Sequence, residues 1–453
     1  MDPLSLHEIA AMSGAALVRG SGDAIVKRVG KDTRSLQPGD LYVALRGENF
    51  DGNAFAAEAA AGGAAAVLLD SPDAIAQLPE GFPALLASDG LRSLTALAEA
   101  WRARLNLRVV CITGSNGKTS TKEFAAAVLG AKYRVAKTQG NLNNHIGVPL
   151  SILSAGSADT AAVWEIGMNH AGEIAPLAAL ARPEAAIITN IGVAHIEHLG
   201  SREAIALEKG SLAEAVPATG VVILSASDDQ SDGMASRTRA RVVRTGLEGG
   251  DVTADQLVEE ESGCSFVLHA EGVSLPARIP CNGAHMVANA LHAVAAGLAF
   301  GVPLAEAAHR LEKTALTGGR LERRTIRGVH FLDDTYNASP DSMAAALRTL
   351  RALPGHGHRI AVLGRMGELG TYAGEGYRRT GVAAASHADI LVTVGPETAP
   401  LAEAAREAGM ARIHEVQDTA SASRMLAQLA RPGDIVLVKG SRAARMEKTI
   451  EEF

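Results

Sequence analysis

The chain has 453 residues, which is too long for one ordinary core and predicts two to four domains. Hydrophobic residues make up 47% and charged residues 21%, the balance of a soluble globular protein. The net charge of −7 and the lack of a long basic run argue against nucleic acid or an anionic membrane as a main partner.

The cysteine count and the hydropathy pattern indicate in which compartment the protein is expected to function. Cys111, Cys264 and Cys281 form no CxxC pair and leave an odd count, which is typical of a reducing cytosol. The start of the chain, MDPLSLHEIAAMSG, has no apolar core of signal-peptide length. The most apolar long stretch, MVANALHAVAAGLAFGV, carries Asn289 and His292 and predicts a buried helix. We therefore expect a cytoplasmic protein without membrane insertion.

Three regions follow one another along the chain. Residues 1–89 hold the strand-like run DLYVALRG, an alanine-rich helix from Ala54 and the run AAAVLLD, which predict a small α/β domain. Residues 90–318 open with the helical segment DGLRSLTALAEAWRARLN and then alternate short apolar runs with helical patterns. Residues 319–453 repeat this alternation. Such alternation predicts mostly parallel sheets covered on both faces, so we expect an α/β fold of three domains.

The expected strands can be read in chain order. In the second region they are RVVCIT, YRVAKT, AAVWEIG, AAIITNIG, GVVILSA and ARVVRTG. Next, SFVLHAEGVSLPARIP predicts a small antiparallel hairpin, and AHMVANALHAVAAGLAFG predicts a helix. In the third region VHFLDD, RIAVLG, ILVTVG, RIHEV and DIVLVKG predict a doubly wound sheet. Ligands of such sheets bind at the carboxyl ends of the strands.

The segment TGSNGKTSTKE, residues 113–123, lies between a predicted strand and a predicted helix. Its glycines let backbone N–H groups turn toward a phosphate, and the positive end of the helix faces the same anion. Lys118 suits the β- and γ-phosphates, and the Thr119 hydroxyl suits Mg²⁺. The candidate phosphate-binding residues are Gly114, Ser115, Asn116, Gly117, Lys118, Thr119 and Ser120.

Other interpretations of this turn are weaker. The general pattern G-x-x-x-x-G-K-[ST] has glycine where this chain has Ile112, so the loop is a shortened relative of that pattern. An ordinary strand, turn and helix with a surface lysine is the plain alternative. The guanine-reading motif N-K-x-D and the kinase motif H-R-D are absent, which argues against a GTPase and a protein kinase.

Polar side chains follow the next two strands. Glu165 ends one strand, and its carboxylate is a suitable Mg²⁺ ligand. His195 comes after the next strand and is a less usual Mg²⁺ ligand, so a hydrogen-bonding loop residue is the alternative. Lys209 lies on a predicted helix, where the residue pattern alone predicts a solvated side chain.

A loop rich in amides, KTQGNLNNHIGVPLS, contains Thr138, Asn141, Asn143 and Asn144. Such loops often only satisfy their own turns, but they also bind polar substrates that bear a sugar or a phosphate. The residue pattern leaves both interpretations open.

Together these segments resemble the Mur ligases, the ATP-dependent amide-forming enzymes of peptidoglycan precursor synthesis, over nearly the whole chain. TGSNGKTSTKE resembles their ATP loop. GAHMVANALHA resembles their G-x-H-N-x-x-N-A segment, with Met286 in place of Asn, and implies that His285 and Asn289 face the adenine. GGRLE implies that Arg320 approaches the ATP phosphates.

The third region carries the most specific resemblance. FLDDTYNASPDSM is similar to D-D-[ST]-Y-N-A-N-P-x-S-M, the signature of the family member that adds D-alanyl-D-alanine, with Ser339 in place of Asn. It implies that Asp334, Tyr336 and Asn337 lie near the nucleotide or the incoming dipeptide. The D-Y-A-H-x-P and D-x-A-H-N-P motifs of other members are absent.

Further departures and matches complete the resemblance. Arg365 stands in LGRMGELG where an aspartate is common, and Tyr377 stands where the family often has histidine. The first region resembles the uridine-nucleotide-binding domain of the family, with Asn53 in place of the usual histidine. Its implied substrate contacts are Thr33, Arg34, Asp51 and Gly52.

The resemblance implies ATP-dependent ligation of D-alanyl-D-alanine to UDP-N-acetylmuramoyl-tripeptide through an acyl phosphate, with ATP and Mg²⁺ as cofactors. The implied catalytic residues are Lys118, Glu165, His195, Lys209, Arg320 and Asp334. The implied metal ligands are Thr119, Glu165, His195 and a carbamylated Lys209. We expect a monomer. The rivals are another ligase of the same fold and a catalytically silent module that senses UDP-sugars, and the third residue of the tripeptide stays open between diaminopimelate and lysine.

Overall fold

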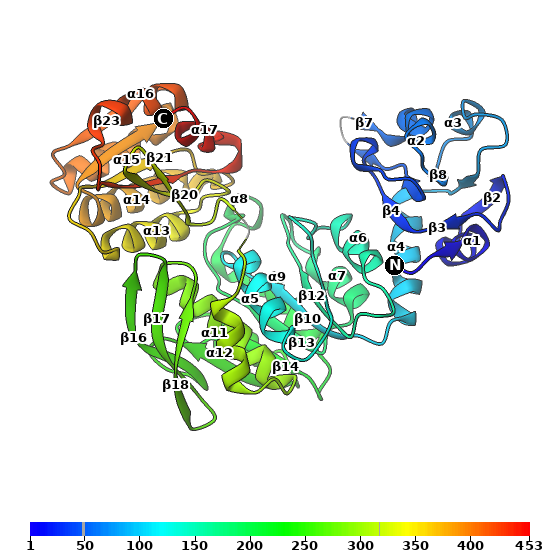
Figure 1. Ribbon diagram of the computed structural model, residues 1–453, viewed down its shortest axis with the longest axis horizontal. Coiled ribbons are helices and arrows are strands. Elements are labelled where there is room, and N and C mark those ends of the chain that lie inside the picture. Colours follow the sequence, from blue (N-terminus) through cyan, green and yellow to red (C-terminus); the bar gives the residue numbers. More distant parts are fainter. Residues whose placement is uncertain (48–49, 317) are drawn as a thin grey trace. The chain divides into compact units, whose positions relative to one another are not determined.

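The computed structural model describes residues 1–47, 50–316 and 318–453, and these divide into two compact units. The first unit comprises Met1–Cys111, Tyr133–Met168 and Glu173–Glu184. The second comprises Ile112–Lys132, Asn169–Gly172 and Ala185–Phe453. Helices and largely parallel sheets build both units (Figure 1), which confirms the predicted α/β fold class.

A five-stranded sheet forms the amino-terminal part of the first unit. Its order is β2-β9-β8-β5-β4, and only β2 runs antiparallel to its neighbour. The strands are β2 (Ala16–Arg19), β4 (Arg28–Gly30), β5 (Asp40–Val43), β8 (Ala66–Leu69) and β9 (Ala84–Leu86). Two short pairs join β1 (Leu4–Ser5) to β3 (Ile25–Val26) and β6 (Arg46–Gly47) to β7 (Phe50–Asp51). Every residue of β5 and β8 is buried, which is why both strands appear in the sequence as predominantly apolar runs.

The longest helix of the first unit is α4 (Gly90–Arg104), and three other helices pack against it. The other helices of this unit are α1 (Leu6–Ser13), α2 (Ala56–Ala61), α3 (Pro72–Ala76), α6 (Gly147–Ser154) and α7 (Ile174–Ala181), with 3₁₀ turns η1 (Thr33–Ser35) and η2 (Gly52–Phe55). Helix α4 packs against α1, α6 and α7. It begins where the Asp89 carboxylate accepts the Arg92 N–H at 2.7 Å, a favourable N-cap. Trp101 of α4 donates to the carbonyl of Ala155 at 2.9 Å, and Trp164 is fully buried.

Strand β10 (Arg108–Thr113) belongs to both units, since its last two residues are in the second. In the first unit, β11 (Val135–Lys137) and β12 (Ala161–Glu165) are parallel neighbours. In the second unit, β13 (Ala185–Ile188), β14 (Val221–Ser225) and β15 (Arg241–Gly246) are parallel. The N–H of Thr189, just after β13, donates to the carbonyl of Thr113 at 3.0 Å.

The predicted small hairpin is part of a larger antiparallel extension. Three strands, β16 (Val252–Glu260), β17 (Gly263–Ala270) and β18 (Val273–Ile279), run antiparallel to one another. Strand β16 also pairs in parallel with β15, so the extension continues the parallel sheet. The prediction missed β16 because a bulge between Asp255 and Val258 interrupts its alternation of apolar and polar residues.

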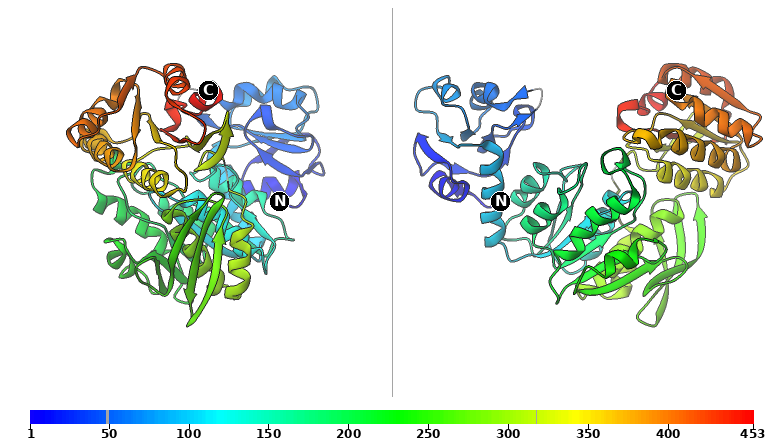
Figure 2. Two further views of the ribbon diagram at one scale, coloured as in Figure 1. Left: turned by 60° about the vertical axis from the view of Figure 1, so that its left-hand side comes forward. Right: turned by 180° about the vertical axis from the view of Figure 1, so that it is seen from behind.

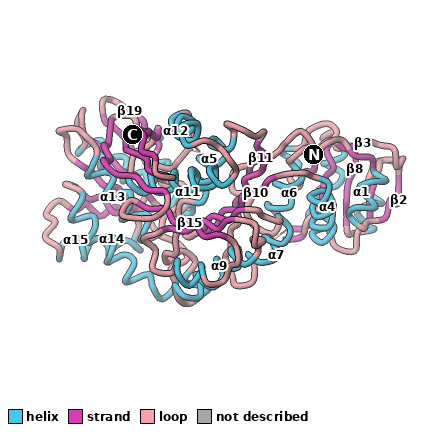
Figure 3. The backbone as a smooth tube through the Cα atoms, turned by 90° about the horizontal axis from the view of Figure 1, so that it is seen from below, coloured by secondary structure: helices cyan, strands magenta, loops and turns pink. Residues whose placement is uncertain are grey.

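Helices cover the central sheet of the second unit. They are α5 (Lys118–Leu129), α8 (Ile196–Leu199), α9 (Arg202–Glu214), α10 (Ser231–Ala235), α11 (Ala284–Ala299) and α12 (Leu304–Glu312). Helices α5 and α11 pack side by side (Figure 3). Gly297 allows them to pack closely, because a Cβ atom there would lie 2.4 Å from Cγ1 of Val128. The buried helix predicted from its apolar sequence is α11.

The carboxyl-terminal part of the second unit contains a six-stranded sheet of order β19-β20-β24-β21-β22-β23. The strands are β19 (Glu322–Ile326), β20 (Val329–Asp334), β21 (Arg359–Leu363), β22 (Ile390–Val394), β23 (Ile413–Val416) and β24 (Ile435–Lys439). All are parallel except β19, an edge strand that runs antiparallel to β20. The prediction missed β19 because its sequence, ERRTI, is mostly charged, as edge strands often are.

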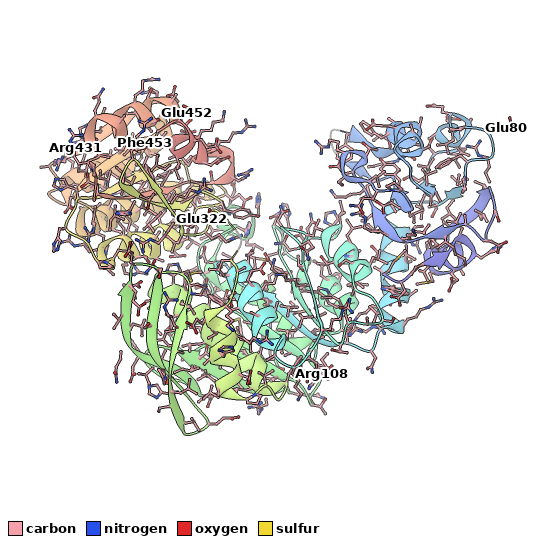
Figure 4. All side chains as sticks on the ribbon, in the orientation of Figure 1. Glu80, Arg108, Glu322, Arg431, Glu452 and Phe453 are labelled. Atoms are coloured by element: carbon pink, nitrogen blue, oxygen red, sulfur yellow. The ribbon has the colours of Figure 1, made fainter. Side chains whose placement is uncertain are left out.

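Helices lie on both faces of this carboxyl-terminal sheet (Figure 2). The chain moves one way across the sheet from β20 to β23 and back to β24, so right-handed crossovers place the connecting helices on opposite faces. The helices are α13 (Pro340–Ala352), α14 (Ala373–His387), α15 (Ala399–Glu407), α16 (Thr419–Leu429) and α17 (Glu447–Glu451). The 3₁₀ turns are η3 (Gly370–Tyr372), η4 (Pro396–Thr398) and η5 (Arg442–Ala444). The last residue, Phe453 (Figure 4), packs its ring edge-on against Phe331 of β20 with 5.0 Å between centroids.

Candidate active site

The predicted phosphate turn is a loop of four residues between β10 and α5. Gly114 and Gly117 have φ values of 147° and 82°, which side chains with a Cβ atom rarely adopt. A Cβ atom at Gly117 would lie 2.3 Å from Oδ1 of Asn289 on α11. Both glycines are therefore required by backbone conformation, and Gly117 also by the close approach of α11.

The loop that follows β13 supports the phosphate turn. The N–H groups of Ser115 and Asn116 donate to the carbonyl and to Oδ1 of Asn190 at 2.9 and 3.1 Å. The N–H of Gly192 donates to Oγ of Ser115 at 2.9 Å, and the Thr189 hydroxyl donates to the carbonyl of Asn116 at 2.5 Å. Residues 189–192 were missed as site residues. Their one signal is their position at the carboxyl end of a parallel strand.

Two cationic side chains lie at the start of α5. Lys118 Nζ donates to the carbonyl of Gly114 at 2.8 Å, within its own loop. Arg320 Nη2 donates to the hydroxyl of Thr119 at 3.0 Å. The guanidinium of Arg320 also stacks on the ring of Tyr336, 4.1 Å from the centroid. The second unit thus brings Arg320 and Tyr336 to the phosphate turn and the start of α5, which lie in a distant part of the sequence.

His195 lies at the N-terminus of α8 and contacts a residue that the prediction missed. Its Nδ1 lies 2.5 Å from Oε2 of Glu368, in the loop after β21. The imidazole beside it lowers the pKa of the Glu368 carboxyl. Glu368 belongs to the segment LGRMGELG, where no residue pattern distinguishes the glutamate as a site residue.

Lys209 on α9 is buried, so the solvated side chain that its residue pattern predicts is wrong. Its neighbour Leu207 is instead 64% exposed, because tertiary packing and not hydrophobicity decides which face of α9 is inside. Burial lowers the pKa of the Lys209 ammonium well below its ordinary value, and the charge of Lys118 lowers it further. An uncharged amine is therefore favoured at this position.

Glu165 and the amide-rich loop are described within the first unit. The buried Glu165 accepts at Oε1 from Nδ2 of Asn143 at 2.8 Å, and its N–H donates to Oγ1 of Thr138 at 3.0 Å. Asn144 Oδ1 caps the start of α6 by accepting backbone N–H groups at 2.9 and 3.2 Å. The carbonyl of Asn141 accepts the N–H of Asn143 at 2.8 Å. Part of the loop satisfies its own turns, and Asn143 and Thr138 instead orient Glu165.

Helix α11 carries both predicted nucleotide residues, of which Asn289 is buried and His285 is half-buried. Burial lowers the pKa of His285 to about 4, against the opposing effect of Asp334. Asn289 lies beside Gly117 and donates to Sδ of Met286 at 3.8 Å. Met286, the departure from the family pattern, is a buried residue of the helix.

His292, one turn further along α11, is also buried and has its pKa lowered to about 4 by burial. Its Nδ1 lies 2.7 Å from Oγ1 of Thr245. Between pH 6.5 and about 4 the unfolded chain protonates this residue and the folded chain does not, so stability falls as the pH falls. Compared with the wild type, His292→Gln is expected to flatten this decline by up to ~1.4 kcal/mol per pH unit.

Urea denaturation followed by circular dichroism at pH 7, 6 and 5 measures this dependence. His309→Gln, which changes an exposed histidine of α12, is the control and is expected to keep the wild-type slope. An unchanged slope in His292→Gln would contradict the expected uncharged state of His292.

Asp334 ends β20 directly beside Lys439, which ends β24. Lys439 Nζ donates to Oδ2 of Asp334 at 2.6 Å and to the carbonyl of Asn337 at 2.9 Å. The N–H of Tyr336 donates to the carbonyl of Gly319 at 3.1 Å. The prediction missed Lys439, although its position at a strand end was available from the sequence.

Ser339 occupies the position where the family usually has Asn, and it is the N-cap of α13. Its Oγ accepts the N–H of Ser342 at 3.4 Å and donates to Oδ1 of Asn116 in the phosphate turn at 2.9 Å. Serine and asparagine are both good N-cap residues, so this departure preserves the cap.

Ser339→Ala is expected to lower the free energy of unfolding by ~1 kcal/mol, because it removes the cap of α13. Ser339→Asn is expected to retain most of that energy. Urea denaturation followed by circular dichroism compares the two variants with the wild type. Equal stability of the alanine variant and the wild type would show that the cap contributes little.

Tyr377 and Arg365 are the other two departures from the family pattern in the carboxyl-terminal part. Tyr377 is buried, and its hydroxyl accepts the N–H of Met366 at 3.0 Å, which fixes the loop after β21. Arg365 forms a loose, exposed ion pair with Glu397 at 3.8 Å.

The predicted uridine-nucleotide residues lie in η1, in η2 and at the end of β7. The exposed Arg34 pairs with Asp32 at 2.6 Å, and this pairing lowers the pKa of Asp32 to about 2. Thr33 is the first residue of η1. Asp51 caps η2 by accepting the N–H of Asn53 at 2.9 Å.

A glycine and an amide fix the same turn. A Cβ atom at Gly52 would lie 2.6 Å from the backbone nitrogen of Leu45, so only glycine fits there. Asn53, at the departure from histidine, donates to Asp51 and Asp70 at 2.7 Å each. The structure thus gives Asn53 a local structural role.

Two features are absent from the residues that the structure describes: a cluster of metal-binding side chains and a membrane-spanning helix. No three His, Cys, Asp or Glu side chains among residues 1–47, 50–316 and 318–453 are gathered where they could hold a metal ion. Mg²⁺ that binds with nucleotide phosphates needs only one or two protein ligands. Within the same ranges, no helix has the length and apolar character needed to cross a membrane.

Three segments of the chain match known domains. Residues 25–99 match the Mur ligase family catalytic domain, residues 112–297 the Mur ligase middle domain, and residues 319–442 the Mur ligase glutamate ligase domain.

Named relatives match the chain over nearly its full length. It is 37% identical to the UDP-N-acetylmuramoyl-tripeptide–D-alanyl-D-alanine ligase of Bacillus subtilis, a match that covers 95% of this chain and 93% of the relative. A crystal structure of MurF from Acinetobacter baumannii is 31% identical with a TM-score of 0.89, covering 100% and 99% of the two chains. MurF ligase from Thermotoga maritima in complex with ADP is 28% identical with a TM-score of 0.82, covering 94% and 96%.

Proposed function

Because the chain belongs to the Mur ligase family, we propose that it joins D-alanyl-D-alanine to UDP-N-acetylmuramoyl-tripeptide and converts ATP to ADP and phosphate. This substrate pair is supported by the names of relatives that match nearly the whole chain. One observation carries the proposal: the glycine turn at 114–117 meets Lys118, Thr119, Arg320 and Asn289 in one place. That arrangement suits a nucleoside triphosphate.

The proposed reaction has two steps. A carboxylate is a poor electrophile, so the terminal carboxylate of the tripeptide first attacks the γ-phosphorus of ATP and releases ADP. The resulting acyl phosphate is then attacked at its carbonyl carbon by the amine of the dipeptide. The tetrahedral intermediate expels phosphate, and the amine loses its proton as the amide forms. Several anions must meet, so the protein mainly neutralises charge and aligns the reactants.

The cationic side chains of the second unit supply this neutralisation. Lys118 follows the phosphate turn directly and is suited to the β- and γ-phosphates. Arg320 comes from the segment before β19, and its bond to Thr119 places the guanidinium beside the same turn. Asp334 and Lys439 lie at the carboxyl ends of the neighbouring strands β20 and β24. Nucleotides bind at this edge of α/β sheets. The half-buried His285 and the buried Asn289 beside Gly117 fit a role toward the adenine.

Mg²⁺ is proposed as the metal because all the proposed donors except the His195 nitrogen are hard oxygens. Thr119 and Glu165 would hold one ion with the phosphates, and His195 with a carbamate on Lys209 would hold a second. Bound Mg²⁺ would offset phosphate charge. The buried, uncharged amine of Lys209 is the form that attacks CO₂, losing one proton to give the carbamate. Without that modification, the uncharged amine would offer a nitrogen and no hard oxygen to Mg²⁺.

The remaining proposed assignments concern the substrate contacts, the roles of the domains, the cellular location and the oligomeric state. Thr33, Arg34, Asp51 and Gly52 are proposed to contact the uridine nucleotide, and Tyr336 and Asn337 the nucleotide or the dipeptide. Thr138, Asn141, Asn143 and Asn144 are proposed to contact the muramoyl substrate. Domains at 1–89, 90–318 and 319–453 would bind the UDP-sugar, bind ATP and complete the site on closure, which excludes water from the acyl phosphate. We propose that the protein acts as a cytoplasmic monomer.

The decisive experiment measures phosphate release with ATP, Mg²⁺ and UDP-N-acetylmuramoyl-tripeptide, with and without D-alanyl-D-alanine. Release that depends on the dipeptide is expected, and tripeptides ending in diaminopimelate and in lysine are compared. Release with a single amino acid or with glutamate and folate, but not with the dipeptide, would favour another ligase of this fold. ATP binding without phosphate release, even with both substrates, would favour a nucleotide-sensing module.

A further inference from the structure

The loop after β21 touches the segment that carries His195 through both side chain and backbone. Glu368 Oε2 lies 2.5 Å from Nδ1 of His195. The N–H of Glu197 donates to the backbone carbonyl of Glu368 at 3.3 Å. At Gly370 a Cβ atom would lie 3.1 Å from Cβ of Glu197. The two segments, 364–370 and 195–199, therefore meet at close range within the second unit.

Both residues of this contact have an unusual backbone conformation. His195 has a φ of 66° and Glu368 a φ of 59°, a left-handed region that residues other than glycine seldom occupy. Their surroundings hold them there: α8 begins directly after His195, and Tyr377 binds Met366 in the Glu368 loop. Such conformations concentrate at functional sites, because the fold must maintain them. The geometry of the pair is thus set by the fold and not by the mobility of long side chains.

We propose that Glu368 is a positioning residue that fixes the tautomer and ring orientation of His195. The proposal rests on the proposed function, in which His195 is a metal ligand. A carboxylate at Nδ1 requires a proton on that nitrogen, so a neutral imidazole then carries its lone pair on Nε2. Histidines that bind metals commonly donate their other N–H to a carboxylate, and the 2.5 Å contact makes Oε2 of Glu368 the candidate acceptor for Nδ1. Through Glu368, the carboxyl-terminal part of the chain thereby orients the lone pair on Nε2 of His195 for metal binding.

The direct test is ¹⁵N NMR of the full-length, histidine-labelled protein without nucleotide or metal, at a single alkaline pH. The variant His195→Gln identifies the His195 signals by their loss. The wild type is expected to show His195 protonated at Nδ1, and Glu368→Ala is expected to shift it toward the Nε2-protonated form. Glu368→Gly, which tolerates the positive φ, is the second variant, and Glu403→Ala, which changes an exposed side chain of α15, is the control. The same His195 tautomer in the wild type and both Glu368 variants would overturn the proposal.

Kinetics provide an independent readout. In the phosphate-release assay, Glu368→Ala is expected to raise the Mg²⁺ concentration for half-maximal rate by ~10-fold, the usual effect of losing a partner of a metal ligand. Glu368→Asp is expected to recover part of this loss, and Glu403→Ala to match the wild type. An unchanged Mg²⁺ requirement in Glu368→Ala would count against the positioning role. If the wild type itself releases no phosphate, the proposed function fails, and the NMR comparison still decides the role of Glu368.

Discussion

Lys118→Ala is expected to lower the rate of phosphate release by at least ~100-fold, the scale of losing one preorganised charge-stabilising contact. Lys118 is the first residue of α5, directly after Gly117, so its ammonium lies at the positive end of that helix. Alanine keeps the helix and removes only the charge. The rate is measured with saturating ATP, UDP-N-acetylmuramoyl-tripeptide and D-alanyl-D-alanine.

Two comparisons make this result specific to the phosphate turn. Lys313→Ala removes an exposed lysine at the end of α12 and is expected to leave the rate unchanged. The melting temperature of Lys118→Ala is expected to remain close to that of the wild type, since Lys118 is not part of the core. A near-normal rate in Lys118→Ala would remove the phosphate assignment.

Lys209→Ala is expected to lower the same rate by ~100-fold, and added acetate or formate is expected to restore part of it. The reason is the proposed carbamate, whose oxygens a small carboxylate can replace in the space that alanine leaves. Lys209 is fully enclosed, and truncation of so large a buried side chain opens that space. Rates are measured over a series of acid concentrations at constant ionic strength.

The matched control is Lys118→Ala under the same conditions. That variant lacks a cation and not a carboxylate, so acetate and formate are expected to leave its rate unchanged. Thermal melting of Lys209→Ala checks that the loss of rate is not a loss of fold. Failure of every tested acid to raise the rate of a folded Lys209→Ala protein would argue against the carbamate.

The elements that carry the site were predictable because their signals are local. A buried parallel strand appears as a continuous apolar run, as in β10 and β24, and a phosphate turn appears as glycines followed by Lys-Thr. Strands β16 and β19 were missed, since a bulge hides the pattern of one and charged residues occupy the other. Their place in a sheet depends on neighbours that are remote in the sequence.

The partners of the site residues were not predictable for the same reason. Asn190 supports the phosphate turn, Glu368 contacts His195, and Lys439 pairs with Asp334, and each pair is formed by tertiary packing. The burial of Lys209 is the clearest case, because its helical position says nothing of what covers it. The family resemblance anticipated a special role for this lysine where the residue pattern could not.

The placement of both tryptophans has a practical consequence for spectroscopy. Trp101 and Trp164 are the two tryptophans of the chain, and both lie in the first unit. Intrinsic indole emission therefore reports chiefly on α4 and β12 in the first unit, and is largely blind to melting of the carboxyl-terminal sheet. A new fluorophore introduced near β22 or β23 would give the second unit its own optical signal and allow the two transitions to be followed separately.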